Sequence, residues 1–316
     1  MLLNLLLLLT GFTALILGAN FLVSGASSFA RRFHVSELAV GLTIVAFGTS
    51  TPELVVNIVA SRNGLSEVLL GNVIGSNIFN LLFILGISGT ILPLFVQQKT
   101  VWLEIPISMI AVLVLYVLAN TTSNGSVSVI GLPGGIILLS LFAGFLIYVF
   151  FNLRSAVPAT TTTVNKPVIL SIALIIAGLT GLILGGKLVV NESSKLAAQF
   201  GMSEKLIGLT IISIGTSLPE LATSVVAALK KNSDMAIGNI IGSNIFNIFL
   251  VLGVCAVINP IEYPRALNTD LIILGISTLL LFTAMFTGKT KKLDRWESML
   301  LVLLFIGYLI NIITRN

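Results

Sequence analysis

Residues 41–61 read GLTIVAFGTSTPELVVNIVAS, and residues 71–80 read GNVIGSNIFN. The chain repeats this pattern in its second half, with GLTIISIGTSLPELATSVVAA at 208–228 and GNIIGSNIFN at 238–247. The two copies align without a gap, and each places one carboxylate, Glu53 or Glu220, in an otherwise apolar segment. The best-matched letters of the repeat are therefore its polar ones.

The composition is that of a membrane protein. Of 316 residues, 56% are hydrophobic and 9% are charged, and the mean hydropathy is +1.09. A soluble domain carries roughly a quarter charged residues. A single cysteine, Cys255, excludes a disulfide framework and a cysteine metal cage. The net charge of +5 is attributed to Lys and Arg in cytoplasmic loops, and no nucleic-acid partner is expected.

The apolar segments predict an all-α polytopic membrane protein with ten transmembrane helices, since a span needs about 20 mainly apolar residues. The N-terminal MLLNLLLLL has no basic region before it, so it is interpreted as the first span and not as a signal peptide. The expected spans are approximately Leu2–Ala30, Ser36–Ser61, Glu67–Pro93, Val101–Ala119, Val129–Leu153, Pro167–Gln199, Glu204–Leu229, Met235–Ile258, Thr269–Phe286 and Trp296–Thr314.

These spans divide into two halves of five. The first half is 1–153, with its α-repeat at 36–94, and the second is 167–316, with its α-repeat at 203–261. A linker rich in Thr, Pro and Ala, 154–166, joins them. An odd number of spans per half inverts the second copy, as in many secondary transporters that bind substrate at the midplane. A duplication kept only for packing is the alternative.

The Lys and Arg distribution predicts the orientation. With the N-terminus outside, the inside loops hold eleven of these residues and the outside segments hold five. Lys187 is the only Lys or Arg deep within an expected span. The bias towards the inside predicts that both termini lie outside a cell membrane, plasma or inner, which the chain crosses many times.

The acids sit among oxygen-bearing neighbours that suit a hard cation. An ionised carboxylate in hydrocarbon costs at least a few kcal/mol, so it is expected to face a cavity or a bound cation. Pro52 and Pro219 each remove a helical N–H and free a carbonyl four residues earlier. The neighbouring hydroxyls and amides are those of Thr49, Ser50, Ser76, Asn80, Thr216, Ser217, Ser243 and Asn247. Such ligands favour Na⁺ or Ca²⁺ over soft metals.

Two carboxylates also suggest how the ions would compete. If both are ionised, the site carries −2, which one Ca²⁺ or two Na⁺ neutralise. A site that is neutral with either load exchanges one ion for the other, which is the requirement for antiport. Alternating movement of the halves around the site would then carry the ions across.

At these residues the chain resembles the sodium/calcium exchanger family, within the cation/Ca²⁺ exchanger group. GTSTPEL with GNVIGSNIFN resembles the first α-repeat of that family, and GTSLPEL with GNIIGSNIFN resembles the second. The resemblance implies ten helices in inverted repeats and electrogenic exchange of about three Na⁺ for one Ca²⁺. It also implies ion sites on the second, third, seventh and eighth helices, with the first and sixth helices sliding across them. No cofactor is implied, and a monomer is expected.

The resemblance also assigns roles by position. It implies that Glu53 and Glu220 bind Ca²⁺ together with carbonyls near Thr49 and Thr216, and that these groups also serve Na⁺. The positions implied for Na⁺ binding are the hydroxyls of Ser50, Ser76, Ser217 and Ser243 and the carbonyls of Ala46 and Ser213, with Asn80 and Asn247 facing the centre. Relatives that require potassium often carry Asp at the place of Asn247. Its absence here favours a potassium-independent exchanger.

Three other interpretations stay open. The nearest is a Ca²⁺/H⁺, or cation/proton, antiporter of the same fold, although such relatives tend to carry further acids beside the GN motif. An intramembrane enzyme using Ser50 or Ser217 would need an adjacent base, and the expected spans contain no His. A passive channel is the third, and the two closely matched halves favour alternating access over it.

Overall fold

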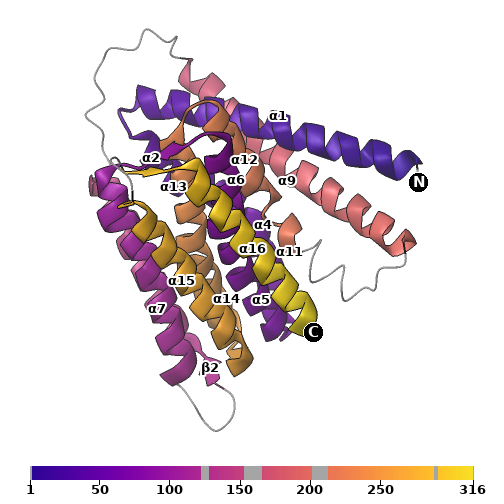
Figure 1. Ribbon diagram of the computed structural model, residues 1–316, viewed down its shortest axis with the longest axis vertical. Helices are drawn as coiled ribbons and strands as arrows, with labels where there is room; N and C mark the ends of the chain where they lie inside the picture. Colours follow the sequence, from indigo (N-terminus) through magenta and orange to yellow (C-terminus); the bar gives the residue numbers. More distant parts are fainter. Residues whose placement is uncertain (1, 122–127, 153–165, 201–212, 288–290, 316) are drawn as a thin grey trace.

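The computed structural model describes residues 2–121, 128–152, 166–200, 213–287 and 291–315. The described chain is almost entirely helical (Figure 1), which confirms the all-α prediction in its main point. The predicted linker 154–166 falls outside these residues except for Lys166, and the seventh expected span, Glu204–Leu229, falls partly outside them.

Helices make up most of the first half. In chain order its elements are α1 (Leu2–Arg32), α2 (Glu37–Val40), η1 (Gly41–Val45), α3 (Ala46–Thr49), α4 (Thr51–Arg62), α5 (Ser66–Ile78), η2 (Phe79–Ile84), α6 (Leu85–Ile91), β1 (Leu94–Phe95), η3 (Thr100–Glu104), α7 (Ile105–Thr121), β2 (Ser128–Ile130) and α8 (Leu132–Asn152). The segments η1, η2 and η3 are π-helical turns, a geometry that is often found at functional sites.

The second half follows a similar order. Its elements are α9 (Val168–Gln199), α11 (Ser213–Gly215), α12 (Leu218–Leu229), α13 (Ser233–Ile245), η5 (Phe246–Val251, π-helical), α14 (Leu252–Ile258), β3 (Ile261–Tyr263), η6 (Arg265–Leu267), α15 (Asn268–Ala284), β4 (Lys292–Leu293) and α16 (Arg295–Arg315). The π-helical turns η2 and η5 begin at equivalent positions of the two copies, so this local distortion recurs with the repeat.

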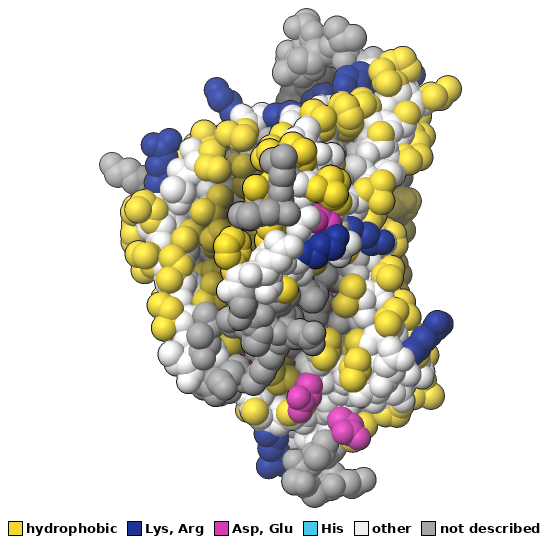
Figure 2. Space-filling model, turned by 90° about the vertical axis from the view of Figure 1, so that its right-hand side faces the viewer, with side chains coloured by type: hydrophobic (Ala, Val, Ile, Leu, Met, Phe, Trp, Pro, Cys, Tyr) yellow, Lys and Arg dark blue, Asp and Glu magenta, His cyan; other side chains and the backbone are white. Residues whose placement is uncertain are grey.

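Eight helices of the described chain are long and apolar enough to cross a membrane. The pair Glu37–Thr49 and Thr51–Arg62, bent by 47°, adds a ninth as one broken span, and α12 is a shorter apolar helix. Hydrophobic side chains cover much of the molecular face in Figure 2, as expected for a protein in contact with lipid. The chain is an integral membrane protein, and these helices account for most of the ten expected spans.

The centre of the bundle is formed by the two helices that carry the GN motifs. Of an apolar stretch of 18 residues in each span, 78% is buried in Ser66–Ile91 and 83% in Ser233–Ile258. The corresponding share in the other long helices is 22–39%. These two spans are therefore shielded by protein, while the others present much of their surface to lipid. Their Ser and Asn side chains consequently lie in the interior.

The long helices α1 and α9 pack closely and run antiparallel. Figure 1 shows them side by side, at a steep angle to α7 and α15. A Cβ added at Gly178 would lie 2.5 Å from the backbone nitrogen of Leu22, and one added at Gly11 would lie 3.1 Å from the carbonyl oxygen of Gly185. Early residues of α1 thus face late residues of α9. With 31 and 32 residues, both helices are about 46–48 Å long, which exceeds a hydrocarbon core of about 30 Å and accounts for a strong tilt.

Two short antiparallel strand pairs connect the halves, which the sequence did not predict. Leu94 of β1 pairs with Leu293 of β4, and Ile130 of β2 pairs with Ile261 of β3. Each pair takes one strand from each half. These strands have only two or three residues, too short to produce a recognisable alternating pattern in the sequence.

Candidate functional site: a buried cation centre

Each copy of the motif breaks its helix directly before the acid. α3 ends at Thr49 and α4 begins at Thr51, while in the second copy α12 begins at Leu218. Each new helix carries proline in its first turn, where the missing N–H costs nothing. Glu53 and Glu220 therefore also lie in a first turn, where the helix dipole favours a negative charge.

The two acids meet at the centre through serines of the opposite copy. Glu53 and Glu220 are each only 1% exposed. Ser50 donates a 2.8 Å hydrogen bond to Glu220 Oε1, and Ser217 donates a 3.1 Å bond to Glu53 Oε1. In a continuous helix Ser50 and Ser217, each three residues before an acid, would lie on the same face as the acid of their own copy. The helix break changes this arrangement, so that each serine binds the acid of the other copy.

Several buried oxygen atoms of the centre have no hydrogen-bond partner among the described residues. They are Glu53 Oε2, Glu220 Oε2, Ser76 Oγ, Asn80 Oδ1 and Asn247 Oδ1. A buried polar atom without a partner carries a desolvation cost of about 1–3 kcal/mol, and more if it is charged. A bound cation would satisfy these oxygens, because carboxylate, amide and hydroxyl oxygens are ligands for Na⁺ and Ca²⁺. The donor set therefore fits the predicted ions.

The threonines of the two motifs are held by asparagines of the helices opposite. Thr49 Oγ1 lies 3.1 Å from Asn239 Oδ1 and 3.3 Å from the carbonyl oxygen of Ala46. Asn72 Nδ2 donates a 3.3 Å bond to Thr216 Oγ1. The Ala46 carbonyl also accepts a 2.9 Å bond from the Ser50 amide. The remaining predicted position, Ser213, begins α11, and its side chain is outside the described part of the structure.

Four asparagines link the two GSNIFN segments, and two of them were not predicted. Asn77 and Asn244 each donate a 3.2 Å bond to the other's backbone carbonyl. Asn80 Nδ2 donates to Asn244 Oδ1, and Asn247 Nδ2 donates to Asn77 Oδ1, both at 3.0 Å. These bonds fix the amides of Asn80 and Asn247 and leave their carbonyl oxygens free for a cation.

Further asparagines support the backbone of the acids and were also missed. Asn57 Nδ2 donates to the carbonyl of Glu53 and to Asn72 Oδ1, both at 2.8 Å. Asn239 Nδ2 donates to Ser224 Oγ at 2.9 Å and lies 3.4 Å from the carbonyl of Glu220. The signal for Asn72 and Asn239 was present, since both belong to the GN pair that recurs in the two copies.

No protein cation neutralises the two acids within the described chain. Its three ion pairs, Arg31–Glu37, Lys195–Glu192 and Lys292–Asp294, involve neither Glu53 nor Glu220. The described residues also contain no group of three or more His, Cys, Asp or Glu that could hold a metal ion. The ligands of a cation here are thus two carboxylates completed by hydroxyls and amides, a set suited to reversible binding of hard ions.

Three further acids are buried in the described chain, which the sequence interpretation did not expect. Glu297 is 5% exposed and accepts bonds from Thr287 and from the backbone amide of Asp294. Glu104 is fully buried and accepts a 2.5 Å hydrogen bond from Tyr148. Glu192 is 2% exposed and pairs with Lys195 at 2.6 Å. Glu104 and Glu192 lie towards the ends of the expected spans Val101–Ala119 and Pro167–Gln199, and for that reason the sequence did not single them out. Each is bound within its own half of the chain, whereas each central acid is bound by the opposite copy.

A cavity of about 210 Å³ lies beside the two helix breaks. Its lining combines the two motif prolines with one face of α9. The lining residues include Pro52, Thr216, Pro219, Lys187 and Asn191. The cavity therefore borders both helix breaks, next to the segments that carry the acids.

Together these features are those of a membrane transport protein with a candidate cation-binding centre: paired buried acids, unsatisfied oxygens and an adjoining cavity inside a helical bundle. Comparison with known families then gives the particular family. The model of the sodium/calcium exchanger protein family matches residues 3–151 and 170–314, so the chain belongs to this family.

Individual relatives agree. The protein of Alkalimonas amylolytica named "Putative antiporter CaxA" is 37% identical over 309 residues, covering 95% of each chain. The sodium/calcium exchanger MaX1 of Methanosarcina acetivorans is 29% identical over 97% of each chain. The solved structure of the sodium-calcium exchanger NCX_Mj, soaked with 10 mM Na⁺ and zero Ca²⁺, superposes with a TM-score of 0.85 at 31% identity over 98% of each chain. The chain is thus an antiporter of the Na⁺/Ca²⁺ exchanger family, which transports these ions without a cofactor and is not a family of enzymes.

Proposed function

We propose that this protein exchanges about three Na⁺ for one Ca²⁺ by alternating access, electrogenically and without K⁺. The observation that carries the proposal is the pair of buried acids, each bound by the serine of the other copy and each with one free oxygen. A centre with two carboxylates is neutral with one Ca²⁺ or with two Na⁺. A third Na⁺ would account for net charge movement.

We assign the ion ligands to the residues that the sequence singled out. Glu53 and Glu220 bind Ca²⁺ with the backbone near Thr49 and Thr216. The Na⁺ ligands are the hydroxyls of Ser50, Ser76, Ser217 and Ser243, the amide oxygens of Asn80 and Asn247, and the carbonyls of Ala46 and Ser213. The free oxygens of Ser76, Asn80 and Asn247 support this assignment.

The conformational change follows from the same geometry. The two halves, 1–153 and 167–316, act as inverted repeats, and the antiparallel packing of α1 against α9 supports this relationship. Glycines at the α1–α9 contact let the two backbones approach closely, so the pair moves as a unit across the centre. The site is complete within one chain, which supports a monomer as the working unit, with both termini outside the cell membrane.

The proposal is tested by Ca²⁺ uptake into Na⁺-loaded vesicles that contain the purified protein. An outward Na⁺ gradient is expected to drive uptake, and the development of an inside-negative potential during uptake would identify the net charge moved. Uptake is expected to be the same with and without external K⁺. The proton-coupled alternative predicts uptake driven by a pH gradient in Na⁺-free medium, so that result would overturn the proposal.

A further inference from the structure

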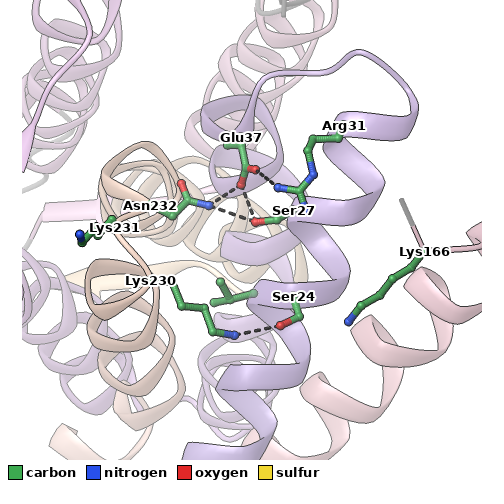
Figure 3. A pocket seen from close by; sticks show the side chains of 9 residues that line it. Ser24, Ser27, Arg31, Glu37, Lys166, Lys230, Lys231 and Asn232 are labelled. Carbon is green, nitrogen blue, oxygen red and sulfur yellow. Dashed lines mark hydrogen bonds and ion pairs between the residues drawn. The ribbon is translucent and has the colours of Figure 1, made fainter. Parts of the chain in front are cut away.

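A second cavity, of about 460 Å³, lies away from the cation centre. It is enclosed by the C-terminal part of α1, the start of α2, the turn between α12 and α13, and Lys166 just before α9 (Figure 3). Its size falls in the range of pockets that hold small molecules, roughly 300–1,000 Å³. Its charged lining residues are Arg31, Glu37, Lys166, Lys230 and Lys231, with a formal charge of +3.

Among the described residues, Glu37 is the only acid that lines the cavity, and it is already engaged. The Glu37 carboxylate forms an ion pair with Arg31 at 3.3 Å, accepts a 2.6 Å hydrogen bond from Ser27 and accepts a further bond from Asn232. Arg31 therefore neutralises Glu37 within the cavity lining, and the three lysines have no acid opposite them there. The Nε atom of Arg31 is buried without a hydrogen-bond partner among the described residues.

Two of the lysines approach the same place from opposite sides. Figure 3 shows Lys166 and Lys230 reaching towards Ser24 of α1. Lys230 Nζ donates to Ser24 Oγ at 2.9 Å and to the carbonyl of Asn20 at 3.0 Å. Burial and, to a smaller extent, the charge of Lys166 lower the pKa of Lys230. An anion between the two ammonium groups would relieve this repulsion.

The basic cluster does not arise from the duplication. In the alignment of the two copies, the positions that correspond to Arg31, Lys230 and Lys231 are Ala198, Asn63 and Gly64. The polar residues of the ion centre occur in both copies, whereas these three basic residues of the cavity have uncharged counterparts in the other copy. The end of the molecule that holds the cavity is the one which the Lys and Arg distribution places inside the cell. The cluster therefore has a purpose separate from symmetric ion binding.

We propose that this cavity binds a phosphate group, carried either by the headgroup of an anionic lipid or by a free phosphate. Lys ammonium groups act as point-charge ligands for phosphate, and the hydroxyl of Ser24, which accepts a bond from Lys230, can donate a hydrogen bond to it. Basic pockets between transmembrane helices on the cytoplasmic side are suited to lipid headgroups. A bound phosphate would bridge Lys166 beside α9 and Lys230 beside α12.

The test uses the full-length protein, purified in detergent and stripped of lipid, in Ca²⁺-free buffer because phosphate precipitates Ca²⁺. One arm titrates inorganic phosphate by calorimetry at constant ionic strength. The other measures retention of phosphatidic acid against phosphatidylcholine by native mass spectrometry. The variant Lys166→Gln with Lys230→Gln is expected to weaken binding by about tenfold or more. A matched control, Lys99→Gln with Lys291→Gln, removes the same charge outside the cavity and is expected to bind normally.

The outcomes separate the two sources and decide the proposal. Retention of phosphatidic acid without binding of inorganic phosphate supports a lipid headgroup, and saturable binding of inorganic phosphate supports a free ligand. No binding in either arm, or an equal loss in the cavity variant and the control, overturns the proposal. If the double variant unfolds, the single variant Lys166→Gln replaces it in both arms, because Lys166 lies outside any helix and its substitution should not disturb the fold. Because binding is measured without transport, failure here leaves the exchange proposal untouched.

Discussion

Glu53 and Glu220 occupy equivalent places in two copies of one motif, yet their surroundings differ. Both are buried, begin a helix and accept a bond from the serine of the opposite copy. Glu220 Oε1 has a second hydroxyl neighbour, Ser243, at 3.4 Å. The equivalent hydroxyl of the first copy, Ser76, has no partner among the described residues.

This difference separates what the duplication conserves from what it leaves free. The charge of the centre and the crossed serine bonds are common to both copies, so we expect them to determine which ions are exchanged. The Ser243 hydroxyl contacts a carboxylate, whereas the equivalent Ser76 hydroxyl has no partner among the described residues. We therefore expect these two serines to affect how tightly each ion is held. Substitutions in equivalent positions test this division directly.

The largest effect is expected for loss of either acid. With Glu53→Gln or Glu220→Gln, one carboxylate remains and a Ca²⁺ ion would leave one positive charge uncompensated. An uncompensated charge within a membrane costs roughly 2.5–3.5 kcal/mol, which corresponds to about a 100-fold loss of affinity. Na⁺-driven Ca²⁺ uptake should fall to background in both variants equally. Full uptake by one of them would show that the two acids are not equivalent.

Glu104→Gln is the matched control for these variants. Glu104 is buried as completely as the central acids, and its Oε2 likewise has no partner among the described residues, but its Oε1 accepts a bond from Tyr148 of the same half and not from the opposite copy. The control tests whether burial of an acid by itself is enough to make it essential. We expect the variant to keep Na⁺-driven uptake, with any loss confined to thermal stability.

The next effect concerns the number of charges. Asn247→Asp or Asn80→Asp adds a third carboxylate, so that one Ca²⁺ no longer neutralises the centre. Each Asn has a free Oδ1 and an amide bound to an asparagine of the other copy, so both variants should behave alike. We expect exchange to slow by about tenfold or more in K⁺-free medium and to recover when K⁺ is added. If the exchange rates of both variants are the same with and without K⁺, this account of Asn247 is wrong.

The crossed serine bonds come third. A hydrogen bond to a charged group contributes about 1.5–3 kcal/mol, so Ser50→Ala or Ser217→Ala should slow exchange by about tenfold or more. The double variant tests whether the two bonds act as one unit. Equal losses in the single variants are expected, because the bonds are equivalent. A loss confined to one serine would show that only one acid is positioned in this way.

The sequence singled out more of the central polar residues than of the asparagines that hold them in place. The constant displacement between the two copies singled out both acids, the serines and Asn80 and Asn247. The structure places these residues in the interior, with Ser50 and Ser217 bonded to the acids of the opposite copy and Asn80 and Asn247 bonded to asparagines of the opposite copy. The sequence did not predict that the serines cross between copies, since a continuous helix places Ser50 beside Glu53. Pro52 indicates that the helix is interrupted here, but the direction in which α4 turns depends on how the bundle packs, and a helical periodicity contains no information about that packing.

Longer-range contacts were missed for a related reason. The bonds between Asn77 and Asn244 join residues that the sequence separates widely, and a lone Asn in a span is also compatible with ordinary helix packing. Glu104 was missed because it lies one turn into its helix, where an acid usually reaches water. Its burial depends on the neighbouring helix that carries Tyr148.

The smallest effect is expected at the position where the two copies differ most. Ser76→Ala removes a hydroxyl that has no partner among the described residues, so it should raise the Na⁺ concentration for half-maximal exchange by about threefold and leave Ca²⁺ affinity unchanged. Ser243→Ala also removes a neighbour of Glu220, so it should weaken both ions by a similar factor. Na⁺ and Ca²⁺ titrations of uptake in the two variants measure this contrast. If both variants change only the Na⁺ concentration for half-maximal exchange, the 3.4 Å contact of Ser243 with Glu220 does not contribute to Ca²⁺ binding. The two copies would then respond alike.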